Sequence, residues 1–126
     1  MALLGAEFLL YPTAIGSETH FPDADSVGHW QRVMQGHAGA NIMPVLASNR
    51  IGREPGKQGT HLDFFGSSFI ADHTGAMVEV ADRESETVLT ATFDLDEIAL
   101  ERAAWAHFRD RRPDLYGVLG TMDGKA

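Results

Sequence analysis

The run Ala-Glu-Phe-Leu-Leu-Tyr at residues 6–11 constrains the fold of this chain more than any other feature. It is short and mostly apolar and it ends at Pro12, which is the pattern of a β-strand. A strand that is apolar on both faces usually lies inside a parallel sheet, with a neighbouring strand on either side. Because only residues 1–5 precede it, with the pattern of a helix's last turn capped by Gly5, we expect part of the sheet to lie before Met1.

Four further apolar runs predict strands, at residues 42–48, 67–72, 76–81 and 87–93. The second and third of these are joined by His73-Thr74-Gly75, which has the composition of a tight hairpin turn. Residues 52–59 are rich in glycine and charge, and we expect them to form a loop.

Two segments carry the start signals of helices. The first covers residues 26–40 and is capped by Asp25 or Ser26. Its predicted inner face consists of residues spaced three or four apart, namely Trp30, Val33, Met34 and His37. The second helix begins at Asp94, which has the spacing of a capping box with Glu97. Strands mixed with helices place the chain in the α/β class.

The composition is that of one globular domain or part of one. At 126 residues, with 44% hydrophobic and 22% charged residues, the chain has enough apolar side chains for a modest core. We assign residues 1–119 to this domain and expect residues 120–126 to be a frayed tail. The net charge of −8 argues against nucleic acid as a partner, because phosphate binding needs clustered Lys and Arg.

The chain contains no cysteine. A disulfide and a thiolate metal site within it are therefore excluded, which fits a reducing compartment. The N-terminus lacks a basic segment followed by an apolar stretch, and no apolar run approaches the ~20 residues that a membrane span requires. We expect a cytoplasmic protein with no membrane partner.

The histidines and acids give no strong metal motif. None of the six histidines forms the helical His-Glu-x-x-His pattern of a zinc site. One loop offers His20, Asp23 and Asp25 as ligands for a divalent cation, but such loop residues are far more often solvated. The pair His61 and Asp63 is a weaker candidate. We expect no metal site.

Three glycine-containing motifs also lack the patterns of known catalytic or phosphate-binding loops. Gly66-Ser67-Ser68 leads into a strand and lacks the Gly-x-Ser-x-Gly pattern of a nucleophile elbow, so we interpret it as a site of close backbone packing. Gly16-Ser17 and residues 36–39 lack the Gly-Lys-[Ser/Thr] of a phosphate-binding loop. These patterns alone indicate an α/β domain that binds a ligand at its strand ends.

Six blocks of sequence carry a family resemblance. They are GAEFLLYPTAIGSE at 5–18, WQRVMQGHAGAN at 30–41, ASNRIG at 47–52, GSSFIAD at 66–72, FDLD at 93–96 and RDRRPDLY at 109–116. Together they resemble the C-terminal half of the N-carbamoylputrescine amidases, a subfamily of the nitrilase (carbon–nitrogen hydrolase) superfamily. The resemblance covers all but the last few residues.

This resemblance implies the C-terminal half of an α-β-β-α sandwich and a Glu-Lys-Cys triad. The thiolate attacks the carbamoyl carbon, Glu shuttles protons and Lys stabilises the oxyanion, with no metal or organic cofactor. Glu7, Glu18 and Lys57 match none of the triad positions. All three triad residues are therefore expected to precede Met1, and we expect these 126 residues to be inactive alone.

The resemblance also assigns substrate contacts, for a carbamoylated diamine, to the loop that follows residues 6–11. Glu18 matches the acid that meets the distal amine, where a charge-assisted hydrogen bond contributes about 1.5–3 kcal/mol. Thr13 and Ala14 are expected to line the floor of the pocket. Asn49 and Arg50 follow the second strand and are expected to support that pocket.

Assembly is the last implication. Family members associate through helical faces, so a homo-oligomer is expected. Without the other half of the sandwich, one sheet face and one strand edge are uncovered, which favours association or aggregation. The alternative function is a non-catalytic remnant that binds diamines, the missing N-terminal half or a full-length homologue.

Overall fold

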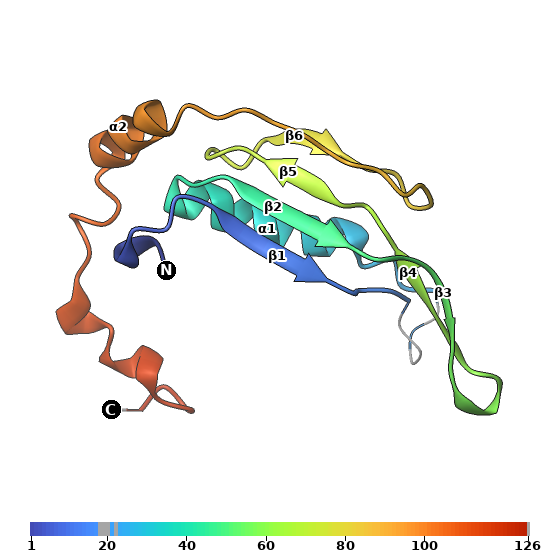
Figure 1. Cartoon of the computed structure of the whole chain (residues 1–126). Coiled ribbons are helices and arrows are strands. Elements are labelled where there is room, and N and C mark those ends of the chain that lie inside the picture. The colour runs from blue at the N-terminus through green and yellow to red at the C-terminus, as the bar shows by residue number, and fades with distance from the viewer. Residues whose placement is uncertain (18–20, 22, 126) are drawn as a thin grey trace.

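The structure, a computed structural model, describes residues 1–17, 21 and 23–125 (Figure 1). Its strands are β1 (Leu9–Thr13), β2 (Val45–Asn49), β3 (Ile51–Pro55), β4 (His61–Phe65), β5 (Phe69–Ala71) and β6 (Met77–Val80). Its helices are α1 (Val27–Asn41) and α2 (Leu95–Trp105). Short 3₁₀ turns lie at Ala2–Leu4, Lys57–Gly59, Pro113–Leu115 and Gly117–Gly120. The predicted α/β class is confirmed.

Four strands form one sheet in the order β1-β2-β5-β6. β1 runs parallel to β2, whereas the β2–β5 and β5–β6 pairs are antiparallel. β3 and β4 form a separate antiparallel ribbon that extends from one end of the sheet, while α1 lies along one sheet face (Figure 1). The carboxyl ends of β1 and β2 therefore meet at the end of the sheet where the ribbon begins.

The core lies between α1 and the sheet. Alternate residues of the strands point to it, and its buried members are Trp30, Ala38, Val45, Ala47, Phe69 and Ala71. The Trp30 ring meets Phe69 edge-on, with ring centroids 5.3 Å apart, and it also packs against Phe65 at 5.9 Å. This aromatic cluster fixes α1 over β5 and over the end of β4.

The first strand begins and ends later than predicted, because it runs through Pro12. The Leu9 amide donates to the Pro44 carbonyl, and the Thr13 carbonyl accepts from the Arg50 amide. Odd-numbered residues of β1 therefore bond to β2, so the Pro12 nitrogen, which carries no proton, faces away from that partner. Among the described residues, β1 pairs only with β2. The other edge of β1 has no partner strand there, so Pro12 interrupts no hydrogen bond between strands.

The first helix agrees with its predicted bounds, but its buried face is rotated. Its N-cap residue is Ser26, whose side chain makes no capping hydrogen bond, and Asp25 just before it accepts from the Val27 amide at 3.1 Å. Val33 is 41% exposed and His37 is also exposed, while Ala38 is fully buried. The turn between β5 and β6 approaches α1 so closely at Gly39 that only small residues fit there, and this contact sets the rotation.

Two of the predicted boundaries along the middle of the chain are wrong. Strand β2 begins at Val45 and not at residue 42, because Ile42 has left-handed backbone angles and ends α1. Of the predicted loop at residues 52–59, residues 52–55 belong to strand β3, whose alternation is hidden by charged side chains on an exposed hairpin, and the rest form the turn before β4. By contrast, the β5–β6 hairpin is confirmed, with the Gly75 amide donating to the Asp72 carbonyl.

Residues 87–93, all of them described, join no sheet, so the predicted strand is wrong. They lead from the end of β6 to α2 (Figure 1). Leu89, Ala91 and Phe93 are half-buried and alternate with exposed residues, which explains the strand-like pattern. Their side chains line grooves with Leu10 and Leu46 on the sheet face opposite α1, where Leu10 is 69% exposed.

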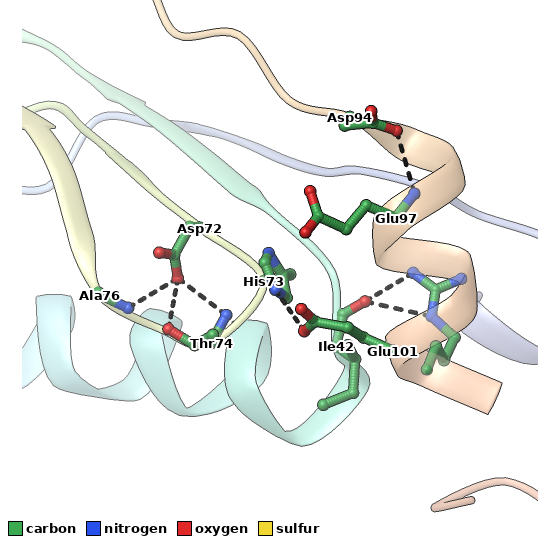
Figure 2. Close-up of polar contacts among 9 residues, drawn as sticks. Ile42, Asp72, His73, Thr74, Ala76, Asp94, Glu97 and Glu101 are labelled. Carbon is green, nitrogen blue, oxygen red and sulfur yellow. Dashed lines mark hydrogen bonds and ion pairs between the residues drawn. The ribbon is translucent and has the colours of Figure 1, made fainter. Parts of the chain in front are cut away.

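Polar contacts hold α2 against the rest of the fold (Figure 2). Asp94 caps the helix by accepting from the Glu97 amide at 3.0 Å, so the predicted helix start is confirmed. The Arg102 guanidinium donates from Nε and Nη2 to the Ile42 carbonyl, at 3.1 and 2.7 Å. Glu101 meets His73 of the β5–β6 turn. None of the described helices is long and apolar enough to cross a membrane.

Candidate functional site

The candidate site is built where the parallel strands β1 and β2 end. Their register pairs Thr13 with Asn49, so the loop that follows each strand starts at the same place. The carboxyl ends of parallel strands are where open sheets commonly build binding sites. Four described residues of the sequence prediction meet there: Thr13, Ala14, Asn49 and Arg50.

Asn49 binds the backbone of the loop after β1. Its Oδ1 accepts from the Ile15 amide at 2.8 Å, and its Nδ2 donates to the Ile15 carbonyl at 3.0 Å. Nδ2 also donates to the Gly66 carbonyl at 2.9 Å. The side-chain amide thus pairs with Ile15 as a neighbouring strand would, and both ends of the amide are satisfied. This geometry fixes the loop relative to β2.

Thr13 and Ala14 lie in the same loop but differ in their contacts. The Thr13 hydroxyl lies 2.9 Å from the Ser48 carbonyl oxygen and 3.1 Å from the Asn49 Oδ1, so its proton is shared within the protein. Ala14 is exposed and its side chain has no polar group. Thr13 therefore joins the loop to β2, whereas Ala14 is a solvent-exposed residue of this loop.

A second anchor holds the far end of the loop. The Ser17 amide donates to the Asp63 carbonyl at 2.7 Å, and the Ser17 hydroxyl accepts from the Asp63 amide at 3.1 Å. Gly16 bridges to Phe64 of β4, and a Cβ at position 16 would overlap the Asp63 carbonyl. Glu18 follows directly, but it lies outside the described residues, as does His20.

Arg50 turns toward the β3–β4 ribbon. Its guanidinium pairs with Glu54 and stacks over the Phe64 ring, 4.3 Å from the ring centroid. Its backbone amide donates to the Thr13 carbonyl at 3.3 Å. In this structure the Arg50 side chain is thus occupied at the base of the ribbon, and its backbone contacts the loop.

Carboxylates gather beside the loop. Asp23, Asp25 and Asp63 line a groove of about 280 Å³ together with Gly16, Ser17 and Arg83. A hydrogen bond from Arg83 lowers the pKa of Asp25, and one from Arg53 lowers the pKa of Asp63. Both carboxylates are therefore ionised at neutral pH, and this side of the loop carries negative charge.

Across the described parts of the chain, no group of three or more His, Asp or Glu side chains is placed to hold a metal ion. Asp25, which the sequence offered with His20 and Asp23, instead pairs with Arg83 at 2.6 Å. Asp63 pairs with Arg53 at 2.6 Å, and His61 lies 3.5 Å from it. These carboxylates are engaged by arginine.

The sequence missed two features of this site. The sequence predicts a polar loop around Ser17 and no element at residues 61–65, so it does not predict the pairing of Ser17 with β4. It also gave Ser68 no role, although its hydroxyl contacts the Asn49 backbone. The Gly66-Ser67-Ser68 motif was the only available signal, and its meaning depends on a contact between residues far apart in sequence.

Residues 1–103 match the carbon-nitrogen hydrolase family. The chain is 59% identical to N-carbamoylputrescine amidase of Arabidopsis thaliana over 98% of this chain and 42% of that protein. It is 60% identical to citrullinase of Francisella tularensis over 94% of this chain and 41% of that protein. The chain thus spans about two-fifths of the length of the curated relatives it matches.

Solved structures agree with this match. A carbon-nitrogen hydrolase from Helicobacter pylori G27 superposes with a TM-score of 0.85 at 36% identity, over 97% of this chain and 43% of that chain. The NitFhit protein of C. elegans superposes with a TM-score of 0.70 at 24% identity, which shows a shared fold. Strands β1 and β2 therefore lie in a region that superposes on part of a longer carbon-nitrogen hydrolase chain.

Proposed function

Since this chain belongs to the carbon-nitrogen hydrolase family, we propose that the protein that carries it hydrolyses N-carbamoylputrescine to putrescine, ammonia and carbon dioxide. The observation that carries the proposal is identity of 56–59% with four plant N-carbamoylputrescine amidases over nearly the whole chain. The reaction consumes one water and replaces the terminal carbamoyl group by a proton.

The chemical step requires groups that these 126 residues do not contain. A cysteine thiolate attacks the carbamoyl carbon, ammonia leaves, and water releases the carbamate, which decomposes to the amine and carbon dioxide. The chain has no cysteine, so we propose that the Cys, Glu and Lys of the triad come from residues outside it. The chain alone is then inactive, and its part is to shape the substrate site.

The loop after β1 is the proposed substrate-binding element. Its backbone is held on one side by Asn49 and on the other by Asp63, which restrains residues 13–17 before any ligand binds. Glu18 follows this restrained segment, and we propose that its carboxylate binds the distal ammonium of the substrate. The acidic groove beside the loop adds negative potential for a cation.

A second substrate has its own support. Citrullinase of Francisella tularensis matches this chain as well as the plant amidases do. Citrulline carries the same terminal carbamoyl group, but its distal end has a carboxylate in addition to the ammonium. The carboxylates of the groove repel that carboxylate, and we therefore rank citrulline second.

The decisive experiment is ammonia release by the full protein from each substrate. We expect kcat/KM for N-carbamoylputrescine to exceed that for citrulline by at least about tenfold. The reverse order would make the protein a citrullinase, and turnover of neither would contradict the proposal. The isolated chain serves as the control for the missing triad, and ammonia release by it would contradict our assignment of the nucleophile to residues outside the chain.

Glu18 is tested in the same assay. Glu18→Gln keeps the shape of the side chain and removes its charge, so KM for N-carbamoylputrescine should rise about 10-fold to 100-fold with a smaller change in kcat. Glu79→Gln on the exposed strand β6 is the matched control and should leave KM unchanged. An unchanged KM in Glu18→Gln would remove Glu18 from the substrate site.

The non-catalytic alternative makes a different prediction. Leu10 is exposed on the sheet face opposite α1, and an apolar face of this kind favours a protein partner. If the chain acts as an interaction subunit, it binds a full-length homologue without adding activity. Two observations together would favour this alternative. The chain would co-purify with a full-length homologue, and the full protein that contains this chain would hydrolyse no carbamoyl substrate.

A further inference from the structure

Ser68 continues the β2–β5 ladder with its side chain. The last backbone pair of that ladder joins Ala47 to Phe69. Beyond it, the Asn49 amide donates to the Ser68 hydroxyl at 2.9 Å, and that hydroxyl donates to the Asn49 carbonyl at 3.3 Å. If the register continued, Asn49 would pair with the backbone of Ser67, and the Ser68 hydroxyl takes that place.

An unusual backbone turn allows this exchange. Gly66 and Ser67 both have left-handed angles, with φ of 56° and 59°, and Ser67 is only 5% exposed. The left-handed region is unfavourable for a residue with a Cβ, so the contacts around Ser67 must compensate. The Ser67 amide donates to the Asp82 carbonyl at 3.0 Å, and Gln31 donates to the Ser67 carbonyl at 3.3 Å. The turn is therefore fixed from two sides.

The turn leaves the Asn49 side chain free to reach the loop after β1. The Ser68 hydroxyl binds both the amide and the carbonyl of the Asn49 backbone. The Asn49 side-chain amide is then available to bind the backbones of Ile15 and Gly66. The Gly66 carbonyl that receives Nδ2 belongs to the same turn that presents Ser68. Ser68, Asn49 and Ile15 are consequently linked in series.

We propose that Ser68 is a positioning residue for the substrate loop and acts through Asn49 on the backbone of Ile15. The hydroxyl sets the position of the Asn49 backbone, and the amide transfers that position to the loop. The proposal rests on the proposed function only where it calls this loop the substrate loop; the link itself is a property of the fold. Its test accordingly has one readout that needs no turnover.

The first readout is hydrogen exchange at the Ile15 amide in the full protein. Ser68→Ala should speed this exchange about fivefold, the factor expected for weakening one hydrogen bond. Ser68→Thr keeps the hydroxyl and should restore the wild-type rate. Thr121→Ala is the matched control, because its hydroxyl donates to the Val118 carbonyl in the C-terminal segment and should not affect Ile15. If Ser68→Ala does not fold, Ser68→Cys fills the same volume with a weaker donor.

The second readout is steady-state hydrolysis. We expect Ser68→Ala and Asn49→Ala each to raise KM, and the double variant to be no worse than Asn49→Ala, because residues in series do not add. Additive effects, or unchanged exchange at Ile15 in the Ala and Cys variants, would overturn the link. Faster exchange in a protein that hydrolyses no carbamoyl substrate would support the link while removing the proposed function.

Discussion

The Nε2 atom of His73 lies 2.7 Å from the Oε2 atom of Glu101, and this contact joins the β5–β6 turn to α2 (Figure 2). The His73 side chain is largely buried, and its other ring nitrogen, Nδ1, has no partner among the described residues. Helix α2 otherwise buries little apolar surface, since Ile98 is its only buried residue. The position of α2 therefore depends strongly on polar contacts.

The first prediction concerns this pair. Replacing His73 or Glu101 with alanine should lower the free energy of unfolding by about 1 kcal/mol, since each change leaves its partner without a hydrogen bond. The double variant should be about as stable as either single variant, which a denaturant titration of all four proteins would measure. Fully additive losses would mean that the two side chains do not interact.

Arg102 gives a second prediction. Arg102→Ala removes both donors from the Ile42 carbonyl and should cost about 1–3 kcal/mol of unfolding free energy, with α2 becoming more open to hydrogen exchange. Arg109→Ala removes a solvent-exposed pair with Asp110 and should leave the free energy of unfolding nearly unchanged. Equal losses for the two arginines would show that the Ile42 contact contributes little.

Gly16 and Gly36 test the loop anchor as a matched pair. Gly16→Ala introduces a Cβ against the Asp63 carbonyl, so it should destabilise the protein by about 1–3 kcal/mol and loosen the loop after β1. Gly36→Ala has open space on α1 and should stabilise the protein by about 0.5–1 kcal/mol. Thermal unfolding of both variants measures the difference, and a tolerated alanine at position 16 would contradict the close approach to β4.

The fourth prediction concerns the loss of thermal stability at low pH. Burial opposes ionisation of Asp72, but hydrogen bonds from Thr74 and Ala76 outweigh it and lower its pKa below the ordinary value of 3.8. A carboxyl with a depressed pKa in the folded state stabilises the protein above its unfolded pKa and loses that contribution as pH falls through the folded value. The Tm should therefore fall below about pH 4, and Asp72→Asn should flatten that fall.

The control for this titration is Asp123→Asn, in the exposed C-terminal segment. It should leave the slope of Tm between pH 5 and pH 2 close to that of the wild type. Asp25 and Asp63 also have lowered pKa values through their arginine partners, so Asp72→Asn should remove only part of the slope. An unchanged slope in Asp72→Asn would mean that the turn does not stabilise its ionised form.

Local signals predicted several elements correctly. The hairpin at His73-Thr74-Gly75 and the cap at Asp94 depend on residues within four positions of each other, and both are confirmed. The hydrogen bond from the Val27 amide to Asp25, just before α1, is of the same kind. Each of these features is a short-range hydrogen bond between a particular side chain or turn and its own backbone, so the sequence contains all the information it needs.

The site depends on contacts that no local pattern reports. Asn49 contacts Ile15 across 34 positions, Ser17 contacts Asp63 across 46, and Arg102 contacts Ile42 across 60. Residues 87–93 show that a local pattern can also mislead. They alternate in burial as a strand does, yet they pair with none of the described strands. Alternation describes burial, whereas a strand also requires a backbone partner at the right distance.

The sequence by itself determined the family, the α/β class and the absence of a cysteine nucleophile from these residues. Motifs, apolar periodicity and composition suffice for these, because they are properties of the chain and its short segments. Only the tertiary structure decided that Pro12 could lie within β1, that α1 turns Ala38 inward, and that Ser68 contacts the Asn49 backbone. Those outcomes were set by packing and hydrogen bonding between distant segments, which exist only once the sheet has formed.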